Sequence, residues 1–294
     1  MSYNEIIKAS RREELLLKRS SLDDVLALLK ELSESLTTAI NNAAIDGTLR
    51  KDQLEQMKRR VEYDLDSFEA AYRQVVTTST NSGAQLILNR NGELMVEAEG
   101  KRTVIDLIQD KVLNEVFNIA GRDGLILSDR IWRISQEAKR DITNRVVQGI
   151  LLGESHSKVA KDIRQYVNGT GGLKYKSERL VLTEFARAYK VANEMSVEVM
   201  REESQFMWYE KWELSPAHKA VDVCDVLAAA NPEGEGPGVY KKAPNRHPGC
   251  YCYIFPVYRE KRKTGKDYGN VSGVQPNASE ASPQDHKLAK QLSM

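Results

Sequence analysis

All three cysteines of the chain, and two of its four histidines, lie in one stretch near the C-terminal end. His218 and Cys224 are followed by His247, Cys250 and Cys252. Thiolate sulfur and imidazole nitrogen suit a d¹⁰ metal ion such as zinc, and a tetrahedral site needs four such donors. The sequence therefore offers these five residues as candidate metal ligands, with zinc as the candidate cofactor.

The local backbone limits how these residues can meet. Pro248 restrains His247 to extended backbone, and Gly249 allows a bend, so His247 and Cys250 can reach one ion. Cys250 and Cys252 are two residues apart, so in a regular strand their side chains would point to opposite faces. Either the strand begins after Cys250, or these two cysteines do not share an ion.

Other interpretations of the cysteines stay open. They can form a reduced, partly buried cluster that ties two segments together, or Cys224 can form a disulfide with Cys250 or Cys252. A nucleophilic pair of Cys224 with either histidine is a further alternative, although the sequence supplies no convincing orienting acid or oxyanion donor. Asp222 is a metal ligand in reserve.

Composition narrows the class of protein. The chain has 294 residues, of which 41% are hydrophobic and 29% charged, as expected for one large or two smaller water-soluble domains. Its formal net charge of +1 argues against a strongly basic nucleic-acid coat, although it allows a local basic patch. We expect no membrane span and no secretion signal, and hence synthesis in a reducing cytoplasm, where clustered cysteines bind metal or stay free more often than they pair.

Apolar periodicity predicts an α+β fold that is mainly helical. In the N-terminal region, 1–125, Ser21 and Asp24 resemble a capping box before an amphipathic helix that ends at Gly47. Thr48 is expected to begin a second helix, antiparallel to the first. The expected apolar stripe of the first helix consists of Leu22, Val25, Leu29, Leu32, Leu36 and Ile40.

One segment of this region has a different pattern. Asn91-Gly92 stands between two apolar runs and predicts a small β-hairpin over 86–96. Helical spacing resumes over 104–120 and again from Ser128 to Ile150. A short helix is expected to begin at Ser155 or Ser157.

The C-terminal part is expected to combine helices with a small antiparallel sheet. A helix opens at Ser177, and an aromatic strand follows over 206–212. A Gly- and Pro-rich loop over 231–244 leads to a second strand over 251–257, ended by Pro256. The basic tail over 259–294 has the composition of a disordered segment.

The order of several motifs carries a family resemblance. The chain resembles, over about residues 131–257, the C-terminal domain of the phage Mu F-type head-morphogenesis proteins, which are minor head proteins of many tailed phages. It departs from the family at Tyr251, where arginine is usual, and in the separation of Pro244 from His247. The matching motifs are, in order, Leu182-Thr183-Glu184, a strand ending at Trp212, Leu214-Ser215, His218, Asp222-Val223-Cys224-Asp225 and His247-Pro248-Gly249-Cys250-Tyr251-Cys252.

The resemblance implies a structural or morphogenetic protein of the phage head, from a family with no established catalytic reaction common to all its members. It implies association with the portal protein and a role in head assembly, DNA packaging or genome ejection. Capsid or scaffolding protein and viral DNA are further implied partners, with no membrane, and the location is the virion, assembled in the bacterial cytoplasm. Region 1–125 would dock on the portal, and 126–258 would be the head-morphogenesis domain.

Two rival functions belong to other classes. The first is a metal-dependent enzyme acting on nucleic acid or a nucleotide, with Glu184 or Asp222 as acid or base. A glutamate on an amphipathic helix is, however, more often solvated or paired than catalytic. The second is a DNA-binding module whose phosphate contacts would come from a basic run, namely Arg259, Lys261, Arg262 and Lys263.

Overall fold

A computed structural model describes residues 1–44, 53–100, 103–120, 124–218, 220–244, 246, 250–260 and 274–292. The chain forms two compact units, each assembled from separate stretches. The first consists of Met1–Leu17, Thr80–Phe117 and Phe185–Met294, and we call it the sheet unit. The second consists of Lys18–Ser79 and Asn118–Glu184, and we call it the helical unit.

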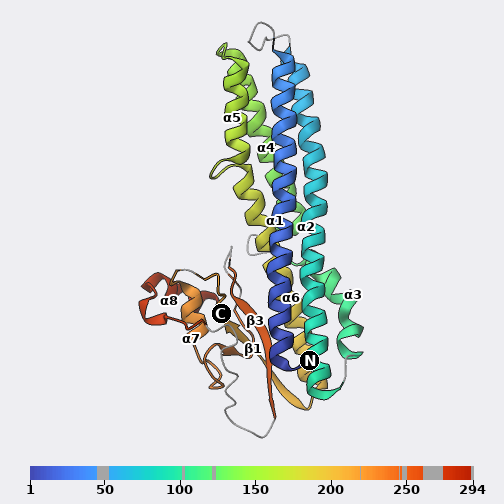
Figure 1. Ribbon diagram of the computed structural model, residues 1–294, viewed down its shortest axis with the longest axis vertical. Coiled ribbons are helices and arrows are strands. Elements are labelled where there is room, and N and C mark those ends of the chain that lie inside the picture. Colours follow the sequence, from blue (N-terminus) through green and yellow to red (C-terminus); the bar gives the residue numbers. More distant parts are fainter. Residues whose placement is uncertain are drawn as a thin grey trace. The chain divides into compact units, whose positions relative to one another are not determined.

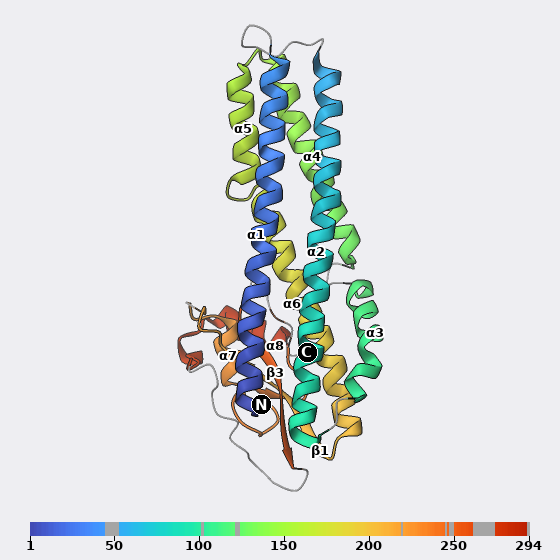
Figure 2. The same ribbon diagram turned by 45° about the vertical axis from the view of Figure 1, so that its right-hand side comes forward.

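Long helices build the helical unit. It contains α4 (Leu127–Leu151), α5 (His156–Asn168) and parts of α1 (Tyr3–Ala43), α2 (Leu54–Glu99) and α6 (Leu173–Glu203). Helices α4 and α5 pack on each other and lie side by side in Figure 1, while in Figure 2 the α1 ribbon passes between them in the view. Apolar residues at helical spacing are buried along these helices, which confirms the predicted stripes. They include Val25, Leu29, Leu36, Ile40, Val61, Leu65, Ile131, Ile142, Val146 and Ile163.

The ends of α4 and α5 follow the sequence signals. Ser155 is the N-cap of α5, where its side chain accepts a hydrogen bond from the backbone N–H of Lys158. Gly153 lies between the two helices at a φ of 64°, which glycine adopts without steric cost. The predicted break after Ile150 and the predicted start at Ser155 are therefore confirmed.

Two predicted helix starts are wrong. Helix α1 begins at Tyr3, so Ser21 lies inside it, buried, with its hydroxyl 2.7 Å from that of Ser79. The spacing of a capping box can therefore also occur inside a helix. Here the hydroxyl of Ser21 has a hydrogen-bond partner on α2, Ser79, and does not cap a helix end. Helix α6 begins at Leu173, one turn before the predicted Ser177. The predicted turn at Gly47 and Thr48 lies outside the described residues.

The sheet unit contains a small antiparallel sheet. Strand β1 (Phe206–Glu213) pairs with β2 (Val239–Tyr240) on one side and β3 (Tyr253–Glu260) on the other, with Trp212 opposite Ile254. Helices α7 (Val223–Ala229) and α8 (Pro283–Leu292) pack on each other, and Figure 1 shows them near β1 and β3. The sheet unit also holds α3 (Thr103–Asn118) and a short 3₁₀ helix, Ala278–Glu280. The predicted α+β class, mainly helical with a small antiparallel sheet, is confirmed.

The predicted β-hairpin over 86–96 is wrong, because α2 continues through it to Glu99. Arg90 and Asn91 are buried, and their side chains hydrogen bond to α6. Arg90 donates to Tyr189 and Asn193, and Asn91 donates to Ser196. These tertiary contacts outweigh the local preference of Asn-Gly for a turn.

The C-terminal strand and tail also differ from expectation. Strand β3 continues through Pro256 to Glu260, because it is an edge strand and a proline there need not donate to a neighbour. The predicted loop over 231–244 contains β2. Residues 274–292 include the 3₁₀ helix and α8. The prediction of disorder is therefore wrong for this part of the tail. Residues 261–273 lie outside the described part of the chain.

Among the described residues, no helix is both long and apolar enough to cross a membrane.

Candidate metal centre

Three buried cysteines converge in the sheet unit. Cys224 lies in the first turn of α7, while Cys250 and Cys252 precede β3. Their sulfur atoms all lie within 4.8 Å of one another, and those of Cys224 and Cys250 are 3.5 Å apart. All three are free thiols in this structure, so it does not show the disulfide considered for Cys224. A cluster of this size can hold a metal ion.

The local backbone explains how Cys250 and Cys252 meet. Strand β3 begins only at Tyr253, so the alternation of side chains along a strand does not apply to the two cysteines. The backbone N–H of Cys252 donates to the sulfur of Cys250 at 3.3 Å, which bends the chain around that sulfur. The sequence left two options, a strand that begins after Cys250 or two cysteines that do not share an ion. The structure shows the first.

The position of Cys224 is fixed by the start of α7. Asp222 is the N-cap, and its carboxylate accepts the backbone N–H of Cys224 at 2.7 Å. Asp225 completes a capping box by accepting the backbone N–H of Asp222 at 3.0 Å. The sequence Asp-Val-Cys-Asp therefore both starts the helix and orients a thiol.

His218 lies beside the cysteines. Its Nδ1 is 3.8 Å from the sulfur of Cys252, and its Nε2 is 2.7 Å from Oδ2 of Asp225. The other carboxylate oxygen of Asp225 accepts the backbone N–H of Asn277 at 2.8 Å. A histidine whose remote nitrogen donates to a buried carboxylate presents its other nitrogen as a lone pair, which is the usual arrangement around metal-bound imidazole.

Electrostatics favour neutral thiols when no cation is bound. Hydrogen bonds with Cys250 and Cys252, followed by burial, raise the pKa of the Cys224 thiol above its ordinary value. Hydrogen bonding with Cys224 lowers the pKa of the Cys252 thiol, but the contact with Cys250 and burial outweigh it and raise that pKa to about 12. A metal ion would have to displace these protons, since the thiolate is the ligand form.

The other candidate ligands are placed as follows. His247 lies outside the described residues. Asp222 Oδ1 is 4.0 Å from Nε2 of His218, and Asp222, Asp225 and His218 form a second group with ligand atoms close enough for a metal ion. His218 belongs to this second group through the side of its ring that faces the carboxylates, while its Nδ1 is 3.8 Å from the sulfur of Cys252.

Asp225 was missed as a site residue by sequence reasoning. A signal was present, because Asp222 and Asp225 have the spacing of a capping box, which predicts a buried carboxylate at the start of a helix. No local sequence pattern, however, indicated that this carboxylate would also contact His218, which lies seven residues earlier in the chain.

The residues of the rival functions are engaged within the protein. Glu184, in the helical unit, is fully buried and forms an ion pair with Arg130. Arg259 lies in β3, where its guanidinium is 2.5 Å from Glu235 and 3.0 Å from the hydroxyl of Tyr209. Lys261, Arg262 and Lys263 lie outside the described residues.

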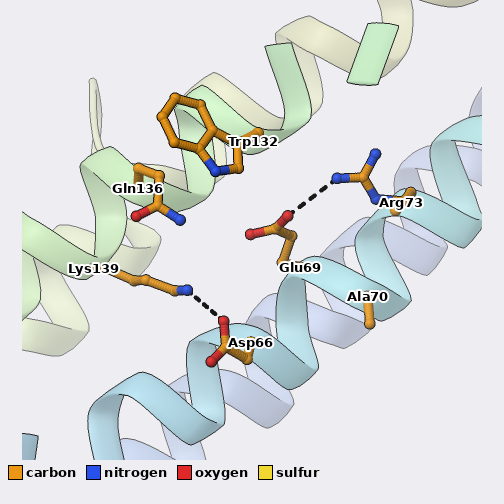
Figure 3. A pocket seen from close by; sticks show the side chains of 7 residues that line it. All are labelled: Asp66, Glu69, Ala70, Arg73, Trp132, Gln136 and Lys139. Carbon is orange, nitrogen blue, oxygen red and sulfur yellow. Dashed lines mark hydrogen bonds and ion pairs between the residues drawn. The ribbon is translucent and has the colours of Figure 1, made fainter. Parts of the chain in front are cut away.

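The helical unit has a separate open pocket of about 460 Å³ between α2 and α4. Figure 3 shows the exposed Trp132 at its rim, with Lys139 paired to Asp66 and Arg73 paired to Glu69. Its charges are matched in pairs across and along the helices, so the pocket shows no preference for a ligand of one sign.

Comparison of the chain with protein-family models, with curated proteins and with solved structures found no match.

Proposed function

We propose that the chain is a minor head protein of a tailed phage whose C-terminal part is fastened by a structural zinc ion. The observation that carries the proposal is the convergence of the Cys224, Cys250 and Cys252 sulfurs within 4.8 Å of one another, with Nδ1 of His218 3.8 Å from the sulfur of Cys252. These residues are also the ones whose order along the chain resembles the Mu F-type head-morphogenesis proteins. Motif order and spatial convergence support the same cluster independently.

The donor set suits zinc. Three thiolates and one imidazole give the Cys₃His set that is common in structural zinc sites. Soft sulfur donors disfavour magnesium and calcium, which prefer oxygen. The cysteines are 0%, 6% and 1% exposed, so a bound ion would be shielded from water.

The same set favours a structural role over catalysis. A catalytic zinc keeps one coordination position open for water or substrate, whereas here Nδ1 of His218, 3.8 Å from the sulfur of Cys252, would supply a fourth protein donor beside the three thiolates. The carboxylates of the enzyme alternative have other partners, since Glu184 pairs with Arg130 and Asp222 caps α7. A bound zinc ion would join three segments of the chain: the connection after β1, the start of α7 and the segment before β3.

The role in the phage head rests on the motif resemblance. We propose that the helical N-terminal region docks on the portal, and that the protein acts in head assembly, DNA packaging or genome ejection within the virion. The basic run after β3 would add contacts to viral DNA, of which Arg259 is described and already paired.

Two measurements test the proposal. Elemental analysis of the purified full chain should find one zinc per chain, and this zinc should be lost in a triple Cys224→Ser, Cys250→Ser, Cys252→Ser variant. Affinity capture of the full chain from cells producing phage heads should recover the portal protein, and the chain should be present in purified virions. Absence from both virions and portal complexes would rule out the head-protein role, and absence of metal would rule out the zinc centre.

A further inference from the structure

The C-terminal segment, residues 274–292, lies on the helix that carries one of the three cysteines. Helix α8 packs on α7, and so does the 3₁₀ helix Ala278–Glu280. Figure 1 shows α8 beside α7. The first turn of α7 supplies the thiol of Cys224 and the carboxylate of Asp225 to the candidate metal centre. The segment therefore contacts the helix that positions two groups of the centre.

One backbone hydrogen bond joins this segment to the centre directly. The N–H of Asn277 donates to Oδ1 of Asp225 at 2.8 Å, and Oδ2 of the same carboxylate is 2.7 Å from Nε2 of His218. Oδ2 also accepts the backbone N–H of Asp222 at 3.0 Å. If Asn277 moved away, one oxygen of the carboxylate would lose the N–H that fixes it. His218 would then be held by a carboxylate with one fixed oxygen instead of two.

The segment has its own helix start but buries few apolar side chains. Ser282 and Asp285 form a capping box at the start of α8, with the N–H of Ser282 3.0 Å from Oδ2 of Asp285 and the N–H of Asp285 3.2 Å from Oγ of Ser282. Among the described residues of the segment, only Ala289 and Leu292 are buried. A segment with so few buried apolar contacts opens locally at a lower free energy than the core of its unit.

The rest of the centre does not depend on this segment. The pairing of β3 with β1 ends at Glu260, before the segment begins, so detachment of the segment breaks none of it. The three sulfur atoms belong to α7 and to the residues before β3, and Asp222 caps α7 by itself. What detachment changes is the hold on Asp225 and, through it, on His218.

We propose that residues 274–292 form a strap that retards the release of zinc from the cysteine–histidine centre by holding Asp225, and through it His218, in place. The inference rests on the proposed zinc centre and adds a control on metal exchange. When the strap opens, the imidazole is the first ligand to leave. A zinc ion with three thiolates and one open position then accepts a competing ligand.

Transfer of zinc from the loaded full chain to a chromophoric chelator measures the release rate. Leu292→Asp places a charge at a buried apolar position, so it should detach the strap and speed release about tenfold. Gln291→Asp is the matched control, because it adds the same charge at the exposed neighbouring position, and should release zinc at the wild-type rate. Hydrogen–deuterium exchange in 283–292 of the metal-free proteins shows, without reference to zinc, whether the strap has detached.

Deletion of residues 274–294 tests whether the strap acts through Asp225. In the otherwise wild-type chain the deletion should also speed release about tenfold. In an Asp225→Ala background, which lacks the carboxylate that Asn277 holds, the same deletion should change the rate by less than about twofold. Non-additivity of this kind is expected for groups in one hydrogen-bonded network.

The outcomes separate the two proposals. If the chain binds one zinc but neither the deletion nor a detached Leu292→Asp variant releases it faster, the strap is wrong and the zinc centre stands. If the deletion speeds release equally in both backgrounds, the segment acts without Asp225, which overturns the proposed route. If the full chain binds no zinc, the centre itself is wrong and the strap fails with it.

Discussion

Asp225 holds His218 by a hydrogen bond of 2.7 Å to Nε2, and Nδ1 of His218 lies 3.8 Å from the sulfur of Cys252. Asp225 is itself only 2% exposed and is fixed by two backbone N–H groups, those of Asp222 and Asn277. A carboxylate held in this way sets both the tautomer and the ring orientation of the imidazole. Asp225 is thus a positioning residue for the candidate metal centre.

Asp225→Asn should weaken zinc binding by about 10–100-fold, as loss of an outer-shell carboxylate typically does. The measurement is a competition titration against a chromophoric chelator. Asp222→Asn is the matched control, because asparagine is an equally good N-cap and Asp222 Oδ1 is 4.0 Å from His218. Equal losses in the two variants would mean that charge, and not orientation of His218, determines the affinity.

Cys250→Ser should destabilise the sheet unit only when zinc is present. At zinc concentrations about a thousandfold above the dissociation constant, binding contributes about 4 kcal/mol to the free energy of unfolding. Thermal unfolding of wild type and variant is compared with zinc and with chelator. The helical unit should unfold unchanged in the variant, and a difference between the proteins that persists in chelator would show that the thiol acts by packing alone.

Zinc binding should release protons and tighten as pH rises. The thiols of Cys224 and Cys252 have raised pKa values, so at neutral pH each must lose its proton to become a ligand. Calorimetric titrations in buffers with different ionisation enthalpies measure the number released. Binding without proton release would show that the ion is held by other groups.

The same thiols set the pH dependence of the metal-free protein. In the fold the pKa of Cys252 is about 12, compared with an ordinary value of 9.0, so the unfolded thiol ionises first as pH rises. The stability contributed by the neutral thiol is therefore complete below about pH 9 and is lost between about pH 9 and pH 12. Cys252→Ala should flatten this part of the stability profile measured by urea unfolding.

Much of the helical architecture could be predicted from the spacing of apolar residues. Apolar residues that recur every three or four positions share one face, and can be buried together, when the segment is an α-helix. The stripe containing Leu29 and Ile40 and the helix that begins after Ser155 are examples. The cysteine cluster was also predictable, since its donors are rare residue types gathered in one stretch. To predict that Cys250 and Cys252 lie in the same cluster, one must know that β3 starts after both of them. A local sequence pattern does not determine that start.

What could not be predicted depended on partners distant in the chain. Asn91 and Arg90 favour a turn or the surface when considered locally, yet α6 supplies hydrogen bonds that keep them helical and buried. The ion pair of Arg246 with Glu14 joins positions more than two hundred residues apart, and no periodicity signals it.

Asn91→Ala should lower the free energy of unfolding of the sheet unit by about 1–3 kcal/mol, the usual cost of leaving buried polar partners unsatisfied. The partners affected include Ser196, which accepts from the Asn91 side chain, and Arg90, whose Nε donates to Asn91 Oδ1. Asn89→Ala is the control, because Asn89 lies on the exposed side of the same helix. Urea unfolding measures both, and an Asn91→Ala variant as stable as the Asn89→Ala variant would contradict the role given to the buried network.

Gly149 allows α4 and α5 to approach closely. A Cβ at this position would lie 2.3 Å from Cγ2 of Val159, whose branched side chain has little freedom to move away. Alanine is the better helix former by about 1 kcal/mol, but the clash should outweigh this and make Gly149→Ala destabilising by about 1–3 kcal/mol. In a Val159→Ala background the clash is removed, so the same Gly149→Ala substitution should become stabilising. Urea unfolding of the four proteins gives the interaction between the two sites, and a Gly149→Ala effect of the same sign in both backgrounds would exclude this contact as its cause.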